Sequence, residues 1–300
     1  MSGSHFTHNG TSLFYTLSNP SPSNKNASAA VAPPTILLLH GWTCDSLDWS
    51  FQLPSLLALG FRVLTLDFRG HGRSDPTSAP ANTNSTLYSP SALAADAAAL
   101  LTHLDITTPV IVTGHSLGAL VAAIVAVEHG PSRVCGLILV DAAYYLDASA
   151  VVGLLAAMRE KDADRAAETV AQMMQTGGLY NERTPEWLKT WHQLRMWGLR
   201  PDVVATVAEE LYGREDSAGL WENAHGYLRK GLGAEREDGV PRLAVVSDDW
   251  KVDVEGKIGL HLARGDKVEV MKEGHWLHQQ DAERFNEIVK GWLEERGFLP

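Results

Sequence analysis

Apolar residues alternate between two patterns along the first 140 residues of this chain. Short continuous apolar runs, several of them bordered by glycine, lie at 35–41, 61–70, 109–114 and 135–141. Amphipathic stretches with apolar positions at helical spacing separate them, at 47–60, 89–104 and 117–129. Continuous apolar strands with helices between them are typical of a parallel sheet that is buried on both faces. The pattern therefore predicts an α/β fold, a mostly parallel central sheet with helices on both faces.

The alternation stops after residue 142 and resumes at residue 241. Successive helical patterns without a convincing strand fill the interval. An apolar run at 241–249, a short one at 267–271 and a helical pattern at 281–296 follow. We therefore expect one core domain, residues 1–142 and 241–300, interrupted by a helical cap at 143–240.

Composition narrows the classes of partner. The 300 residues carry a formal net charge of −11 and no cluster of Lys and Arg, which opposes a nucleic-acid partner. No apolar run reaches the 18 residues of a membrane span, and the N-terminus lacks a signal-peptide pattern. Cys44 and Cys135 are too few for a disulfide framework and have no metal-ligand spacing. We expect a cytoplasmic protein with a small-molecule substrate and no membrane partner; the oligomeric state is not predicted.

The strongest chemical signal is the pentapeptide GHSLG at 114–118. A strand pattern precedes it and a helix pattern follows, so the chain must turn sharply at Ser116. Glycines two residues to either side leave room for that turn, and the serine is held outward in a strained conformation. The amide of Leu117 then lies at a helix N-terminus, where a developing oxyanion is stabilised. We predict that Ser116 is a nucleophile.

Two further motifs follow apolar runs. In HGW at 40–42, the glycine lets the chain bend so that the amide of Trp42 can act as a second oxyanion donor. In GHW at 274–276, His275 lies between the last strand and the last helix and is the predicted general base. His278 is interpreted as a helix-start or surface residue, and His115 as a residue that packs beneath the nucleophile. No metal site is expected, because no third ligand accompanies His275 and His278.

With HGW, DFRGHGRSD, GHSLG and GHW in this order, the chain resembles capped members of the α/β-hydrolase superfamily over residues 35–142 and 241–296. The resemblance implies Ser116 as nucleophile, His275 as base, the amides of Trp42 and Leu117 as oxyanion hole, an acid that orients the histidine, and no cofactor.

The position of that acid is open. Most members place it after the strand that follows the cap, in a G-x-x-D pattern; here that segment reads VVSDDWKVD and has no glycine. Asp249 fits if the turn is one residue shorter, with Asp248 as its neighbour. Other members take the acid from the strand after the nucleophile helix, where Asp141 lies. Asp249 is the favoured prediction, followed by Asp141 and then Asp248.

The predicted cap is rich in tryptophan and methionine, residues that usually pack in a core but that a cap also presents to its cavity. We expect Trp191, Trp197 and Trp276 to bind a small apolar or aromatic substrate.

The predicted reaction is hydrolysis of an ester or lactone. The GHW motif also resembles that of hydrolases that cleave carbon–carbon bonds. Two alternatives are a cofactor-independent ring-cleaving dioxygenase of this fold, whose acid lies where Asp141 does, and a ligand receptor built on the hydrolase fold. Epoxide hydrolases and haloalkane dehalogenases resemble the chain in fold but need a carboxylate at the position of Ser116.

Overall fold

A central sheet organises the molecule. The computed structural model describes residues 3–21, 33–77, 86–160, 166–233, 235 and 238–299. Within them, eight strands pair in the order β1-β2-β4-β3-β5-β6-β7-β8. They are β1 (Gly3–His8), β2 (Thr11–Ser18), β3 (Ile36–Leu39), β4 (Val63–Leu66), β5 (Val110–His115), β6 (Val134–Val140), β7 (Arg242–Val246) and β8 (Lys267–Val270). The β1–β2 and β2–β4 pairs are antiparallel and the other pairs are parallel, so the predicted mostly parallel sheet is confirmed.

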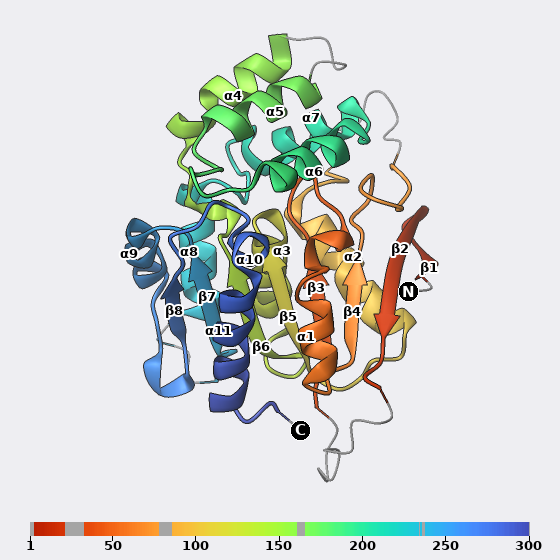
Figure 1. Ribbon diagram of the computed structural model, residues 1–300, viewed down its shortest axis with the longest axis vertical. Helices are drawn as coiled ribbons and strands as arrows, with labels where there is room; N and C mark the ends of the chain where they lie inside the picture. The colour runs from red at the N-terminus through yellow and green to blue at the C-terminus, as the bar shows by residue number, and fades with distance from the viewer. Residues whose placement is uncertain are drawn as a thin grey trace.

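Helices cover both faces of the sheet (Figure 1). Side chains of β3 alternate between the two resulting cores: Leu37 and Leu39 face one, and Ile36 and Leu38 face the other. This alternation follows from the two-residue period of a strand, and it explains why both faces read as apolar. The first core contains residues of α2 (Pro90–His103), α3 (Leu117–His129) and α8 (Trp221–Leu232); the second contains residues of α1 (Leu53–Ala58) and α11 (Ala282–Glu295).

Four helices of the predicted insertion lie above the sheet in Figure 1. They are α4 (Ala148–Glu160), α5 (Ala166–Thr176), α6 (Glu186–Trp197) and α7 (Pro201–Tyr212). We call them the cap. Helix α8 also belongs to the interval 143–240, but it packs against α3 and α9 (Asp249–Ile258) beside the sheet. Its buried Leu228 and Leu232 join the sheet core, which is the physical reason that it does not lie with the cap.

Three short helical segments lie at strand ends: η1 (Ser46–Trp49), η2 (Ala143–Tyr145) and α10 (Leu277–Gln280). A further turn, η4 (Leu262–Arg264), precedes β8. The segments that leave β3, β5, β6, β7 and β8 meet beneath the cap, where the candidate site lies. Within the described ranges, none of the helices combines the length and apolar character that a membrane crossing requires.

Candidate active site

The turn between β5 and α3 has the geometry that the GHSLG motif predicts. Ser116 has φ 53° and ψ −115°, a strained backbone for a residue with a side chain. A Cβ added to Gly114 would lie 2.0 Å from the carbonyl oxygen of Gly118, and one added to Gly118 would lie 2.3 Å from that of Leu39. Both positions therefore require glycine, and the close packing holds the serine at the top of the strand.

The loop after β3 lies directly against this turn. A Cβ on Gly41 would come within 3.3 Å of the Ser116 Cβ, so glycine lets the backbone approach the serine. His40 fixes the loop from below: its Nδ1 is 2.8 Å from the Gly41 carbonyl oxygen, and the Phe68 amide donates to its Nε2 at 2.9 Å. Trp42 lines the same cavity as Ser116, and Leu117 is the first residue of α3.

His275 is bonded to Asp141. The imidazole Nδ1 lies 2.6 Å from Asp141 Oδ2, and the carboxylate is 1% exposed. Burial alone would raise the pKa of Asp141, but the His275 hydrogen bond and the Lys251 ammonium hold it well below its ordinary value. Burial lowers the pKa of His275 to about 4, against the opposing effect of Asp141. At neutral pH the pair is therefore a neutral imidazole that faces a carboxylate.

The favoured prediction for the orienting acid does not fit this geometry. Asp249 is the first residue of α9, its side chain is 73% exposed, and it pairs with Lys272. Asp248 lines the cavity, but its side chain is 55% exposed and its Oδ1 lies 3.7 Å from Lys272 Nζ. Asp141, the second candidate, is the carboxylate that the structure brings to His275.

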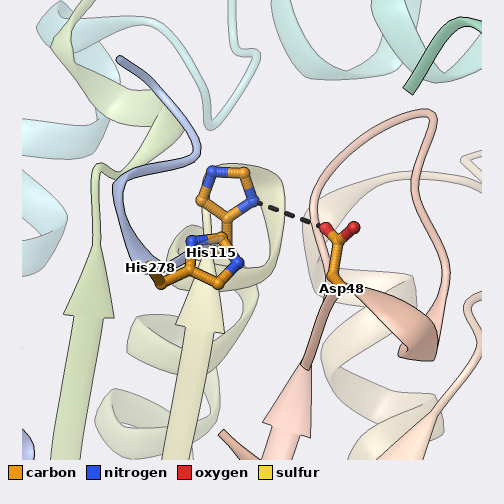
Figure 2. A group of neighbouring side chains, drawn as sticks. All are labelled: Asp48, His115 and His278. Carbon is orange, nitrogen blue, oxygen red and sulfur yellow. Dashed lines mark ion pairs between the residues drawn. The ribbon is translucent and has the colours of Figure 1, made fainter. Parts of the chain in front are cut away.

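Two further histidines, His115 and His278, lie beneath the site, and both are fully buried. His115 Nε2 is 3.0 Å from the carbonyl oxygen of His275, so it ties the Ser116 turn to the loop of His275. His278 is at the start of α10 as predicted, but it is fully buried, with its ring 4.6 Å from that of His115. Figure 2 shows both rings facing Asp48, whose Oδ2 lies 3.8 Å from His115 Nδ1.

Asp48, His115 and His278 form the group whose ligand atoms are close enough, among the described residues, to hold a metal ion. A cation already lies there. Arg195, on cap helix α6, reaches down so that its Nη1 is 2.5 Å from Asp48 Oδ1. Although burial alone would raise the pKa of Asp48, Arg195 and His115 hold it well below its ordinary value. A guanidinium in contact with the carboxylate disfavours a second cation, so we assign no metal to this group.

The Asp48–Arg195 ion pair connects the core to the cap, and its loss is expected to destabilise the protein. The two side chains are 0% and 9% exposed, so Arg195→Met would leave a buried carboxylate without its partner. We expect the free energy of unfolding to fall by about 3–5 kcal/mol, measured by urea denaturation. Adding Asp48→Asn should recover part of the loss, because it removes the unpaired charge.

Lys189→Met is the matched control for that experiment. Lys189 lies on the same helix and pairs with Glu186 at 2.7 Å, but the Glu186 side chain is 85% exposed. Exposed ion pairs contribute little to stability, so this variant should unfold close to the wild type. Equal stability of the Arg195 and Lys189 variants would contradict the structural role given to the buried pair.

A cavity of about 380 Å³ opens above Ser116 and His275. Its wall is largely apolar and comes from the cap and from strand ends; it includes Trp42, Leu146, Leu154, Met173, Met174, Leu179, Tyr212, Trp250 and Trp276. Trp276 was predicted to lie here, and its ring stacks on that of Tyr180 at 5.3 Å.

Trp191 and Trp197 were also expected at the cavity, but the structure does not place them on its wall. Helix α6 buries Leu188, His192 and Met196, which fall on one face at four-residue spacing. Trp197 is 59% exposed, and Trp191 lies beside Phe51 with the Arg195 guanidinium 4.5 Å above its ring. Helical spacing alone does not reveal which face of a cap helix meets the cavity.

Sequence reasoning missed two cations of the site, Arg195 and Lys251. A long basic side chain on an amphipathic helix is ordinarily exposed to solvent. Asp48, the partner of Arg195, is remote in the sequence. Lys251 lies four residues after Ser247, a spacing at which its ammonium returns to the end of β7. This four-residue spacing, in the segment with Asp248 and Asp249 where the expected glycine is absent, is the signal in the sequence that could have pointed to Lys251.

Comparison with known proteins agrees with the fold. The model of the alpha/beta hydrolase family matches residues 36–288. The chain therefore belongs to this family. A non-heme haloperoxidase of Rhodococcus erythropolis is 37% identical over 107 residues, a match that covers 36% of this chain and 36% of the relative's length.

Solved structures extend the similarity to nearly the whole chain. A thermophilic esterase from Thermogutta terrifontis superposes with a TM-score of 0.70 at 20% identity, covering 99% of each chain. The enol-lactonase from Burkholderia xenovorans LB400 gives a TM-score of 0.70 at 17% identity, over 97% of this chain and 100% of that one. At these identities the similarity establishes the fold.

Proposed function

We propose that this α/β-hydrolase family protein hydrolyses an ester or lactone of a small apolar or aromatic compound, with Ser116, His275 and Asp141 as its triad. The observation that carries the proposal is the bond between His275 Nδ1 and buried Asp141, beside the strained turn of Ser116. A serine hydroxyl is a weak nucleophile unless an oriented base removes its proton. The pair supplies that base, and Ser116 and His275 line one cavity.

In the proposed mechanism, Nε2 of His275 takes the proton of Ser116 as Oγ attacks the carbonyl carbon. Asp141 accepts a hydrogen bond from Nδ1–H, which leaves Nε2 as the basic nitrogen and stabilises the imidazolium. The backbone N–H groups of Trp42 and Leu117 donate hydrogen bonds to the oxyanion of the tetrahedral intermediate. Collapse re-forms the carbonyl and breaks the bond between the acyl carbon and the leaving oxygen, which takes the proton of Nε2–H.

The second half of the mechanism repeats the first with water. Nε2 of His275 deprotonates a water molecule, which attacks the acyl carbon on Ser116 Oγ. The second tetrahedral intermediate expels the serine, which recovers its proton from His275, and the acid is released.

The chemistry of the cavity supports an apolar or aromatic acyl group. Aliphatic and aromatic side chains dominate its wall, and Ser247, Asp248 and Lys251 are among its polar members. Two structural neighbours, an esterase and an enol-lactonase, are consistent with cleavage of an acyl–oxygen bond.

A panel of substrates tests this proposal. We expect kcat/KM for aromatic esters and lactones to exceed that for short polar esters by about tenfold or more, because an apolar wall discriminates by a few kcal/mol at most. The measurement is steady-state hydrolysis under anaerobic conditions. Faster turnover of the short polar esters would contradict the substrate class.

One observation favours a second candidate, a cofactor-independent dioxygenase. In that class the histidine and an acid at the position of Asp141 deprotonate an aromatic hydroxyl, and here Asp141 is the carboxylate bonded to His275. Leu117 differs from the class, which has a second histidine after the serine. Oxygen uptake with a hydroxyquinolone, and no ester turnover without oxygen, would favour this candidate over the hydrolase.

A further inference from the structure

The Asp141 carboxylate has more partners than the histidine of the proposed triad. Lys251 Nζ donates to both of its oxygens, at 2.7 Å to Oδ1 and 2.8 Å to Oδ2. The backbone amide of Ser247 donates to Oδ1 at 2.9 Å, and His275 Nδ1 lies against Oδ2. A buried carboxylate can accept about four such bonds, so its hydrogen-bonding capacity is filled.

Backbone geometry brings these groups together. Asp141 follows β6 with φ 42°, a left-handed conformation at the end of the strand. The neighbouring strand β7 ends at Val246, and Lys251 follows on the first turn of α9. Its ammonium makes a third hydrogen bond, to Ser247 Oγ at 2.8 Å, so all three of its protons have acceptors. The segment in which an acid was expected thus supplies the cation that holds an acid from the neighbouring strand.

We propose that Lys251 is a positioning residue that fixes the Asp141 carboxylate for His275 and, by sharing its negative charge, favours the neutral imidazole. The inference rests on the proposed function, because it assigns His275 the role of base. Lys251 is 13% exposed and lines the cavity, yet its three hydrogen bonds are to the carboxylate and to Ser247. Positioning therefore explains its contacts better than direct binding of substrate.

Charge provides the physical argument. Asp141 and a neutral His275 with Lys251 form a group of net charge zero, whereas protonated His275 would give a buried group of charge +1. The other titratable groups that face His275 are His115, 4.7 Å away between ring centroids, and His278 beneath it. Facing Lys251 are Tyr145, whose ring lies 5.2 Å from Nζ and whose hydroxyl donates to Glu255, and the cavity residue Asp248.

Of these groups, Lys251 is the cation that contacts the partner of the base. The pKa of His275 is lowered to about 4, by burial first and then by His115 and Lys251, against the opposing effect of Asp141. Without Lys251, the carboxylate would keep the Ser247 amide and His275 as partners and would face no cation other than a protonated His275. The imidazolium would then be more stable, and the base would become protonated at a higher pH.

The test compares Lys251→Gln and Lys251→Arg with the wild type. Glutamine keeps a hydrogen-bond donor and removes the charge, whereas arginine keeps the charge. We expect the acid limb of the kcat/KM profile, near pH 4 in the wild type, to move up by about one pH unit in Lys251→Gln. Lys251→Arg should keep the acid limb of the wild type.

Lys272→Met is the control. Lys272 pairs with Asp249 and Asp248 at the neighbouring surface, and its side chain is 55% exposed. Removing it takes away a positive charge of the same segment that does not touch Asp141, so the profile should stay unchanged. An unchanged acid limb in Lys251→Gln, or an equal shift in Lys272→Met, would overturn the inference.

An NMR titration of the His275 ring tests the inference independently of turnover, because it measures the pH midpoint of that ring directly. The His275→Gln variant assigns the His275 signals. A raised midpoint in Lys251→Gln supports the role of Lys251 even if no ester is hydrolysed, in which case the proposed function alone fails. Ester turnover with an unmoved midpoint would refute the inference and leave the function standing. If Lys251→Gln does not fold, Lys251→Arg decides, since a shifted midpoint with the charge retained contradicts the charge argument.

Discussion

Replacement of Ser116 by alanine is expected to lower kcat for ester hydrolysis by ~10⁶-fold. The loss should be this large because the serine forms the covalent intermediate, so the remaining groups of the site have no acyl acceptor other than water. Alanine retains the Cβ, so the strained backbone at φ 53° should be unaffected and the melting temperature unchanged. Steady-state kinetics and labelling by a fluorophosphonate probe measure the effect.

Ser132→Ala is the control for that variant. Ser132 lies in the exposed turn after α3, where its hydroxyl donates to the His129 carbonyl oxygen. This variant should keep full turnover and full labelling. Persistent labelling of the Ser116→Ala protein would mean that the reactive serine lies elsewhere and that the proposed function is wrong.

Asp141→Asn is expected to lower kcat by ~10⁴-fold, the second-largest effect. The amide nitrogen of asparagine can donate to the imidazole and favour the tautomer in which Nε2 carries the proton, so the base is lost. Lys251 would lose its counter-charge at the same time. Circular dichroism and thermal unfolding separate a folded, inactive variant from an unfolded one.

Asp249→Asn is the matched comparison, because both aspartates follow strands of the same sheet and both were candidates for the acid. Asp249 pairs with Lys272 at the surface, so this variant should retain turnover close to the wild type. If Asp249→Asn is the inactive variant and Asp141→Asn is active, His275 takes its partner from the other segment during the reaction and the triad given above is incorrect.

The sheet could be predicted because its signal is local. The parallel strands β3, β4, β5 and β7 are buried along their whole length, so their residues read as apolar runs, and the flanking helices keep their own periodicity. The turn at Ser116 was equally accessible, since the requirement for Gly114 and Gly118 comes from atoms of the turn itself and from the adjacent strand.

The orienting acid could not be chosen from the sequence, because the choice depends on directions across the sheet. Asp141 and Asp249 both follow strands, at β6 and β7, which are neighbours. A left-handed backbone directs Asp141 toward His275, whereas Asp249 begins α9 at the surface. No spacing pattern distinguishes the two, since the conformation of a single residue decides which carboxylate meets the histidine.

The positions of the cap side chains also could not be predicted from spacing alone. Trp191 and Trp197 were predicted to bind substrate, while nothing in the sequence singled out Arg195 on the same helix. The helix instead buries Arg195 because Asp48, distant in sequence, supplies its counter-charge. A long-range ion pair of this kind overrides the ordinary preference of arginine for solvent.

The loop of His275 also depends on the segment before α6. The His275 amide donates to the Leu179 carbonyl oxygen at 2.7 Å, and Thr184 Oγ1 donates to the Gln280 side chain at 2.7 Å. The segment between α5 and α6 of the cap thus supports the base of the proposed triad, while the cap covers the cavity. In evolutionary terms, this cap cannot be exchanged by itself. If the cap of a homologue were grafted here, it would need to supply its own partners for the His275 loop. Otherwise the graft would change the catalytic machinery together with the specificity.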